Sequence, residues 1–326
     1  MLKLNVPENL SGRKLIRVVC QLEPALKPAA LFKALRKKDI KVNGKRVRQD
    51  LLVYTGDEII IYGLEKTQPD QWQAANTRVL PQLYSMVYAS HQCLIINKKA
   101  GISVHDDPSM DQSETSLIDQ IRQDLGQPQL ELCHRLDRQT SGLIILGCSM
   151  QYADEIRQLM RAGQIIKRYQ ALAKGLPAQG SKVRSYDGQT FLECSAWLEK
   201  KPKESRVYIH ARRQQGDKPV TTRYRIIDTY AVPDDNAPVT RLEIEIISGK
   251  THQIRAHMAY LGHPLLGDGK YGDNAYNKQF RTAEGHLRRQ QLCAAGLYFS
   301  QHIKGPLAEM AGQAFSIEPD FDIAFS

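Results

Sequence analysis

The chain has 326 residues, of which 42% are hydrophobic and 25% are charged, and it carries a formal net charge of +10. This composition is that of a folded soluble protein, and it excludes a disordered or fibrous chain. The longest apolar runs, such as residues 143–146, are far shorter than the roughly 18–20 residues of a membrane span. Residues 1–14 lack the apolar segment and cleavage site of a secretory signal, so we expect a cytoplasmic protein without membrane association.

Most of the positive charge lies in the first fifth of the chain. Residues 1–62 hold 13 Lys and Arg against 6 Asp and Glu, a net charge of +7, whereas residues 63–326 hold 32 against 29, a net charge of +3. Such a concentration is typical of a small module that binds an anionic polymer, most plausibly nucleic acid. A basic, solvated surface that maintains solubility explains the composition equally well, so composition alone leaves both interpretations open.

Residues 13–62 are predicted to form a compact unit of two helices followed by a basic hairpin. In chain order we predict a helix over 15–22, a second helix over 29–38, a hairpin over 40–47 around Asn43-Gly44 and a last strand over 57–62. Two helices that lead into a basic hairpin resemble the small α-L RNA-binding module first described in a ribosomal small-subunit protein. The resemblance implies RNA contacts by the cations of the second helix and the hairpin, among them Lys37, Lys38, Lys45 and Arg46.

A polar segment separates this module from the rest of the chain. Residues 63–82 contain Pro, Gly and several Gln with little periodicity, so we predict a linker. From residue 83 onward helices and strands are mixed. We predict strands over 87–88, 93–96, 142–147, 165–174, 221–228 and 241–247, and helices over 114–125, 149–161 and 251–261.

The mixture of helices with hairpin-like strand pairs predicts an α+β fold and not a doubly wound sheet. The strand over 241–247 alternates Leu242, Ile244 and Ile246 with Glu243 and Glu245, which is typical of a strand.

Residues 134–143 carry the most informative motif, His-Arg-Leu-Asp-Arg-Gln-Thr-Ser-Gly-Leu. A polar loop that joins two elements is the ordinary interpretation of such a stretch. Every specified residue of the His-Arg-Leu-Asp-x-x-Thr-Ser-Gly-Leu signature of the RluA-type pseudouridine synthases is present in order, however, so the chain resembles this family. The resemblance identifies Asp137 as the active-site aspartate.

Two further segments agree with this family. Lys167-Arg168-Tyr169 resembles its Lys-x-Tyr motif, with Tyr169 placed 32 residues after Asp137. Residues 249–255, Gly-Lys-Thr-His-Gln-Ile-Arg, resemble its Gly-Arg-Thr-His-Gln-Ile-Arg segment and are followed by a similar Gly-x-Pro-Leu-x-Gly-Asp at 262–268. Arg255 matches the motif, whereas Lys250 replaces the family's first arginine and loses its two-pronged geometry.

Weaker agreements extend the resemblance from about residue 87 to 299. Residues 97–101, Asn-Lys-Lys-Ala-Gly, resemble the family's Asn-Lys-Pro-Ala-Gly, with Lys99 in place of Pro. Residues 292–295 resemble its Leu-His-Ala-Ala, with Cys293 in place of His, and Gln139 stands where many members carry Asp. The resemblance implies a pseudouridine synthase catalytic domain over 83–326, with a central mixed, largely antiparallel β-sheet flanked by helices. The basic module over 1–62 favours the rRNA-directed branch.

The resemblance also implies roles for individual residues. Asp137 is the expected nucleophile, and it must remain ionised in a site that excludes water. Burial disfavours a charged carboxylate, so a cation is needed beside it. We assign that cation to Arg255, whose guanidinium can pair with a carboxylate through two hydrogen bonds. Tyr169 is expected to stack on the uracil and to place its hydroxyl near carbon 5.

The target uridine must leave the RNA stack before it reaches such a pocket. Arg135 is expected to fill the vacated position, and a phosphate contact or a structural ion pair is its ordinary alternative. His134 and Lys250 are predicted to contact the RNA near the same site.

No metal or cofactor is predicted. The isomerisation transfers no electron, and no two of the six cysteines lie within four residues of each other, so no zinc-type pair exists. The spacing of five between His252 and His257 puts them on different faces of a helix. We interpret the cysteines as thiols of a reducing cytoplasm.

The predicted function is an RNA pseudouridine synthase that acts on large-subunit ribosomal RNA as a monomer. A tRNA-directed synthase and a catalytically silent RNA-binding assembly factor are the alternatives, although intact Asp137, Tyr169 and Arg255 argue against a silent protein. A glycosidase with two carboxylates would need a second acid paired with Asp137, and these motifs contain none. Whether Asp137 attacks the base or the ribose is left open.

Overall fold

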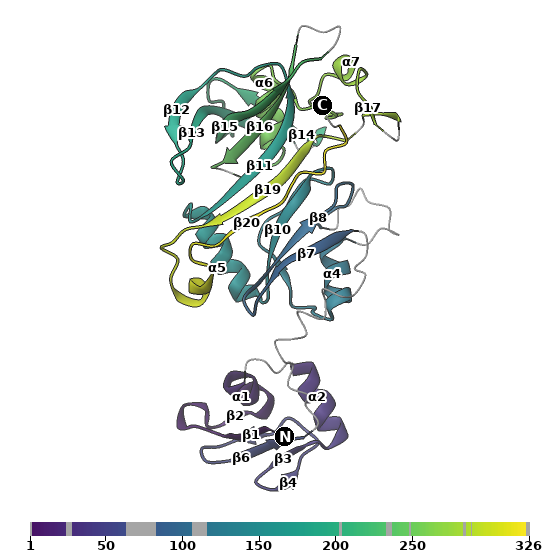
Figure 1. The fold of residues 1–326 in the computed structure, drawn as a ribbon. Coiled ribbons are helices and arrows are strands. Elements are labelled where there is room, and N and C mark those ends of the chain that lie inside the picture. Colours follow the sequence, from purple (N-terminus) through teal and green to yellow (C-terminus); the bar gives the residue numbers. More distant parts are fainter. Residues whose placement is uncertain are drawn as a thin grey trace. The chain divides into compact units, whose positions relative to one another are not determined.

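The structure divides the chain into two compact units, Met1–Arg78 and Val79–Ser326 (Figure 1). The predicted linker, residues 63–82, lies outside the described residues. The computed structural model describes residues 2–23, 28–62, 83–105, 116–201, 204–232, 237–247, 249–282, 285–287 and 289–323.

The first unit combines two helices with short antiparallel strands. Strands β1, β6, β3 and β4 form a sheet in that order, and β2 pairs with β5. The elements described in this unit are β1 (Leu2–Asn5), the 3-10 helix η1 (Glu8–Leu10), β2 (Arg13–Lys14), α1 (Leu15–Leu22), α2 (Pro28–Lys37), β3 (Ile40–Val42), β4 (Lys45–Arg46), β5 (Leu52–Val53) and β6 (Glu58–Ile61).

The elements predicted for the first unit are confirmed. Helix α1 covers the expected residues, and α2 begins one residue earlier than expected, at Pro28, whose fixed φ suits a first helical turn. Asn43 and Gly44 have φ values of 50° and 77°, the left-handed pair that a tight two-residue hairpin turn requires. The cations named above, Lys37, Lys38, Lys45 and Arg46, are exposed.

A single large sheet runs through the second unit. Its strands follow the order β12-β13-β15-β16-β11-β19-β10-β8-β7, and β14, β20 and β9 pair with β13, β19 and β10. The described elements are β7 (Tyr84–Ala89), β8 (Cys93–Lys98), α4 (Leu117–Leu125), β9 (Glu131–Leu132), β10 (Ser141–Gly147), α5 (Met150–Arg161), β11 (Ile165–Lys174), β12 (Ser181–Arg184), β13 (Thr190–Lys201), β14 (Arg206–His210), β15 (Lys218–Tyr230), β16 (Val239–Ile246), α6 (Gln253–Tyr260), α7 (Asn274–Asn277), β17 (Arg281–Thr282), β18 (Gly285–His286), β19 (Leu292–Phe299), the 3-10 helix η4 (Gly305–Met310) and β20 (Ala314–Ser316).

The described pairings of this sheet are antiparallel except the pairing of β10 with β19. Helix α5 packs on it through Ala153 and Ile156, which share a hydrophobic cluster with Leu143 and Ile145 of β10. The expected α+β fold with a mixed, largely antiparallel sheet and flanking helices is therefore confirmed.

Strand β19 joins the two halves of the sheet. It lies between β10 and β11 (Figure 1) and pairs with both. Gly142 of β10 has a φ of 113°, and a Cβ there would lie 2.4 Å from the backbone oxygen of Ala294 in β19. Only glycine permits this approach, which holds the start of β10 against the centre of the sheet.

Both sides of β16 are buried. Glu245 is 1% exposed and Glu243 is 8% exposed, although both are acidic. Arg168 of β11 explains the burial, because its Nε donates to Glu245 at 2.8 Å and its Nη1 to Asp187 at 2.7 Å. Neighbouring residues of a strand face opposite sides of the sheet. Because these ion pairs anchor Arg168 on one side, Tyr169 faces the other side.

The other predicted elements agree with the structure apart from their ends. Strand β11 and helix α5 have the expected bounds, and the Ser149 hydroxyl accepts a hydrogen bond from the Tyr152 amide as an N-cap. Helix α4 begins at Leu117, and residues 114–115 lie outside the described residues. Helix α6 begins two residues later than predicted, because His252 has a left-handed φ of 52°.

Candidate active site

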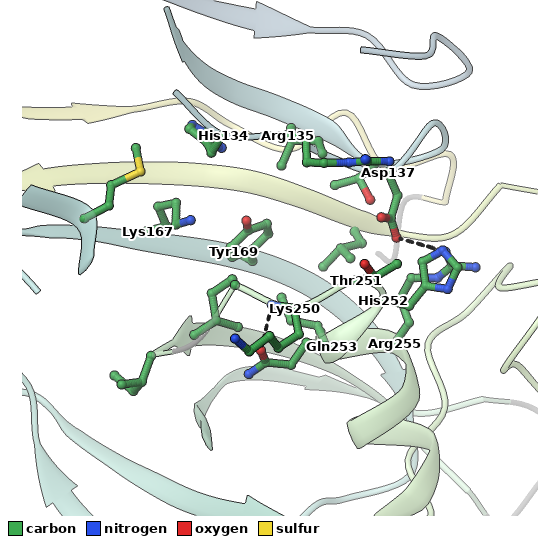
Figure 2. Close-up of a pocket in the computed structure, with 18 of the residues that line it drawn as sticks. His134, Arg135, Asp137, Lys167, Tyr169, Lys250, Thr251, His252, Gln253 and Arg255 are labelled. Atoms are coloured by element: carbon green, nitrogen blue, oxygen red, sulfur yellow. Dashed lines mark hydrogen bonds and ion pairs between the residues drawn. The ribbon is translucent and has the colours of Figure 1, made fainter. Parts of the chain in front are cut away.

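A cavity of about 600 Å³ opens in the second unit, where the loop between β9 and β10 meets β11 and the start of α6 (Figure 2). Four segments that are far apart in the sequence contribute to its walls. The cavity brings together every site residue predicted for this unit: His134, Arg135, Asp137, Tyr169, Lys250 and Arg255.

Asp137 and Arg255 form an ion pair across 118 residues of sequence. Arg255 Nη1 donates to Asp137 Oδ2 at 2.9 Å. A turn in which the Thr140 amide donates to the Asp137 carbonyl holds the aspartate just before β10. The sequence predicted a two-pronged pair, but the structure has one hydrogen bond, because Arg255 directs its other donors elsewhere.

The two-pronged partner of Arg255 is Asp268. Arg255 Nε and Nη2 donate to the two oxygens of Asp268 at 2.6 and 2.9 Å. The Asp268 carboxylate also accepts from the backbone amides of Lys270 and Tyr271. Burial alone would raise the pKa of Asp268, but Arg255 and these amides lower it below its usual value. Asp268 therefore fixes the guanidinium and leaves Nη1 for Asp137.

Sequence reasoning did not assign a role to Asp268. The available signal was its place at the end of the 262–268 segment, which matches the family pattern. Nothing in that pattern states which side chain the carboxylate contacts. The partner became visible only when the structure placed Asp268 beside α6.

His252 forms a second polar contact around Asp137. Its Nε2 lies 3.9 Å from Asp137 Oδ2, and its Nδ1 lies 3.0 Å from the hydroxyl of Tyr271. That hydroxyl accepts from the Val207 amide, so its own proton can be donated to Nδ1. Burial lowers the pKa of His252, against an opposing effect of Asp137. The neutral ring then carries its proton on Nε2, facing the aspartate.

Tyr169 lies on the floor of the cavity. It is 5% exposed and belongs to β11. Burial raises the pKa of Tyr169, and the negative charge of Asp137 raises it further. The hydroxyl therefore keeps its proton at neutral pH, and the ring offers an apolar surface to a planar ligand.

Lys98 is a fully buried lysine whose pKa responds to the charge of Asp137. Its Nζ donates to the carbonyls of Lys99 at 2.8 Å and Arg138 at 3.0 Å. Burial lowers the pKa of Lys98 to about 7, while the charges of Asp137 and Asp320 oppose the shift. Sequence reasoning quoted this lysine only within the Asn-Lys-x-Ala-Gly stretch and gave it no role.

The remaining predicted residues lie at the rim of the cavity or in the first unit. Arg135 and Lys250 are exposed and line the opening. The backbone amide of Lys250 donates a hydrogen bond to the Gln253 side chain at 3.2 Å. Lys37, Lys38, Lys45 and Arg46 belong to the first unit and contribute nothing to this cavity.

The described residues contain no group of three or more His, Cys, Asp or Glu side chains that could hold a metal ion. Within the same parts of the chain, no helix combines the length and apolar character needed to cross a membrane.

Comparison with known proteins gives consistent matches. The model of the RNA pseudouridylate synthase family matches residues 92–260. Ribosomal large subunit pseudouridine synthase C of Vibrio cholerae serotype O1 is 26% identical over 303 residues, which cover 91% of this chain and 88% of that protein. The protein of the same name from Escherichia coli strain K12 is 29% identical over 272 residues, which cover 83% and 79%.

A solved structure shares the fold. Human RNA pseudouridylate synthase domain containing 4 aligns with a TM-score of 0.53 at 20% identity, covering 77% of this chain and 92% of that one.

Replacing Lys98 by Met should change how stability depends on pH. Between pH about 7 and 10.5, the unfolded chain binds a proton at Lys98 that the folded chain does not. The cost of burying this charge is complete below pH about 7 and falls as pH rises toward 10.5. Lys98 therefore makes the free energy of unfolding rise with pH by up to about 1.4 kcal/mol per unit in that range.

Denaturant unfolding at several pH values measures this slope. We expect the slope of the K98M variant to be lower than that of the unaltered protein, whereas K182M, which removes an exposed lysine, should leave it unchanged. Equal slopes for the protein and K98M would show that Lys98 titrates as an ordinary lysine.

Proposed function

The chain belongs to the RNA pseudouridylate synthase family and is a pseudouridine synthase, and we propose that it converts specific uridines of large-subunit ribosomal RNA into pseudouridine. The reaction breaks the bond between uracil nitrogen 1 and the ribose and joins the ribose to carbon 5 of the same base. Carbon 5 loses a proton and nitrogen 1 gains one, so atoms and electrons balance without a co-reactant.

The ion pair of Asp137 with Arg255 inside the cavity carries this proposal. An aspartate can act as a nucleophile only while it is ionised. The 2.9 Å hydrogen bond from Arg255 favours that form, and the guanidinium keeps its own proton because Asp268 and Asp137 outweigh the effect of burial and raise the pKa of Arg255. Asp137 is the proposed nucleophile, and Arg255 stabilises its charge.

Tyr169 is the proposed platform for the flipped uracil. Its ring lies in the cavity beside Asp137, and an aromatic face is suited to stacking on a planar base. Because its pKa is raised by burial and by Asp137, the hydroxyl is protonated and can donate a hydrogen bond near carbon 5. A role as an anionic base is disfavoured for the same reason.

The rim of the cavity is suited to RNA. Arg135 is exposed beside Asp137, and we assign to it the position in the RNA stack that the flipped uridine leaves. Lys250 is exposed on the opposite wall, where its ammonium can contact a phosphate. A base flip costs a few kcal/mol, which these contacts would offset.

Two observations support ribosomal RNA as the substrate. The relatives from Vibrio cholerae and Escherichia coli are named large-subunit ribosomal enzymes. The first unit carries a net charge of +7 over residues 1–62 and exposes the cations of α2 and the β3–β4 hairpin. Arg36 and Arg48 also flank a hollow of about 380 Å³ on this unit. Since the named relatives are bacterial, a ribosomal substrate implies a cytoplasmic enzyme. One chain supplies every proposed site residue of the cavity, which is compatible with a monomer.

Replacing Asp137 by Asn should abolish pseudouridine formation, because the amide keeps the shape but is not a nucleophile. Mass-shift labelling of pseudouridine in treated ribosomal RNA measures the product, and a filter assay measures RNA binding, which should survive within a few-fold. A D137N variant that still formed pseudouridine would exclude Asp137 as the nucleophile.

Replacing Asp268 by Asn should slow the reaction while RNA binding stays within a few-fold. The variant loses the two-pronged, charge-assisted pair that aims Arg255 at Asp137, and a misplacement of about 1 Å can cost roughly 100-fold in rate. Single-turnover labelling measures the rate, and D228N, an exposed aspartate of β15, serves as the control. A normal rate in D268N would mean that Arg255 is held without Asp268.

The first unit is expected to bind RNA through phosphate contacts. Exchanging Lys37, Lys38, Lys45 and Arg46 for Gln should weaken binding and reduce the slope of log affinity against log salt by up to about 3. A matched variant with four exposed lysines of the second unit exchanged, at 182, 200, 218 and 304, should leave the slope nearly unchanged. Equal slopes in the first variant and the unaltered protein would assign the basic surface to solubility.

A further inference from the structure

One part of the cavity is not used by the mechanism above. In Figure 2, His134 and Lys167 lie on one side of Tyr169, while Asp137, His252 and Arg255 lie on the other. Lys167 is two residues before Tyr169 on β11, so it faces the same side of the sheet about 7 Å further along the strand. We call His134 and Lys167 together the lysine end of the cavity.

His134 presents a buried donor that has no acceptor. The Ile145 amide donates to its Nε2 at 3.1 Å, so the proton of the neutral ring is on Nδ1. Burial lowers the pKa of His134 well below its usual value, and the charge of Lys167 lowers it further, against an opposing effect of the Arg135 backbone. Nδ1 is buried and has no hydrogen-bond partner in the described structure. Buried donors without a partner are rare in folded proteins.

Lys167 is half-buried and presents a second donor at the cavity. In the described parts of the chain no carboxylate lies within ion-pair distance of its ammonium, and burial lowers the pKa of Lys167. A Cβ at position 249 would lie 3.5 Å from Nζ, so Gly249 lies beside the ammonium in the wall of the cavity.

The unpaired ammonium of Lys167 sets the chemistry of the missing partner, whereas His134 Nδ1 is enclosed by the protein. A neutral carbonyl would leave the positive charge of Lys167 uncompensated. An anion compensates this charge, and charge-assisted hydrogen bonds of this kind are stronger than neutral ones. An RNA strand whose uracil lies on Tyr169 carries such an anion on either side of that nucleotide.

We propose that Lys167, beside the part of the cavity wall formed by His134, is a subsite for a phosphodiester that flanks the flipped uridine. This inference rests on the proposed function, because it takes the occupant of Tyr169 to be a uracil in RNA. The subsite holds the strand in register, so that the base enters the cavity beside Asp137. Its effect is on binding, since the phosphate contact is the same before and during the reaction.

Neutral phosphate analogues test this proposal. The probe is a short RNA on which the unaltered protein forms pseudouridine, prepared with a methylphosphonate in place of the phosphate before or after the target uridine. We expect one of the two replacements to weaken binding of the unaltered protein about ten-fold or more. K167M should bind the unmodified RNA about as weakly as the unaltered protein binds the methylphosphonate RNA. The same methylphosphonate should not weaken binding by K167M any further, as a double-mutant cycle requires for a direct contact.

The kinetic readout separates a phosphate contact from a structural defect. K167M should raise KM with little change in kcat, because it removes an interaction common to the ground and transition states. K167R keeps a cation and should restore binding, and K182M, on the exposed strand β12, should behave as the unaltered protein. A thermal melt of each variant establishes that it is folded.

Three results would overturn the proposal. The first is K167M with the same loss on methylphosphonate replacement as the unaltered protein. The second is that the unaltered protein binds both methylphosphonate RNAs as tightly as the unmodified RNA. The third is that the binding defect of K167M depends on the identity of the neighbouring base, which would assign the subsite to base recognition. If no ribosomal RNA fragment acquires pseudouridine, the proposed function fails before this test begins.

Discussion

The guanidinium of Arg255 is the group on which the proposed active site depends. This buried cation lies between two carboxylates. Its Nε and Nη2 donate to Asp268, and its Nη1 donates to Asp137. A lysine could neutralise one carboxylate but could not hold two at fixed angles. Because Asp268 is itself held by two backbone amides, the position of Asp137 is set by the protein backbone through two charged contacts. The carboxylate of Asp137 is therefore held in place by contacts within the protein.

The central sheet separates two kinds of polar chemistry. On the face behind Tyr169, Arg168 is surrounded by Glu245, Asp187 and the Ser185 hydroxyl, so its charge is compensated within the protein. On the front face, Lys167 meets no carboxylate of the described residues. Arg168 and Lys167 are neighbours on one strand, but Arg168 pairs with carboxylates of the protein, whereas the proposed counter-ion of Lys167 is a ligand.

The sequence allowed accurate prediction where the information is local. The helices at 15–22 and 149–161, the Asn43-Gly44 turn and the α+β class follow from periodicity and turn chemistry. An unbroken motif identified Asp137, and two further segments that resemble the family identified Tyr169 and Arg255. The sequence did not predict which side chains that are far apart in the chain contact each other. Alternation in β16 identified two faces but not the arginine that covers the acidic one. Likewise, no pattern near Asp268 or Lys98 states what their side chains contact, because those partners are set by packing across the sheet.

The place of β19 has a consequence for synthesis of the protein. This strand, at residues 292–299, inserts between β10 and β11, which have no pairing with each other without it. A nascent chain that has emerged only as far as α6 already contains Asp137, Tyr169 and Arg255, but its sheet is in two pieces with unpaired inner edges. Non-local pairing of this kind is slow and comes late in folding. A chain synthesised only as far as α6 should thus be inactive, and activity should appear only when β19 joins the two pieces of the sheet.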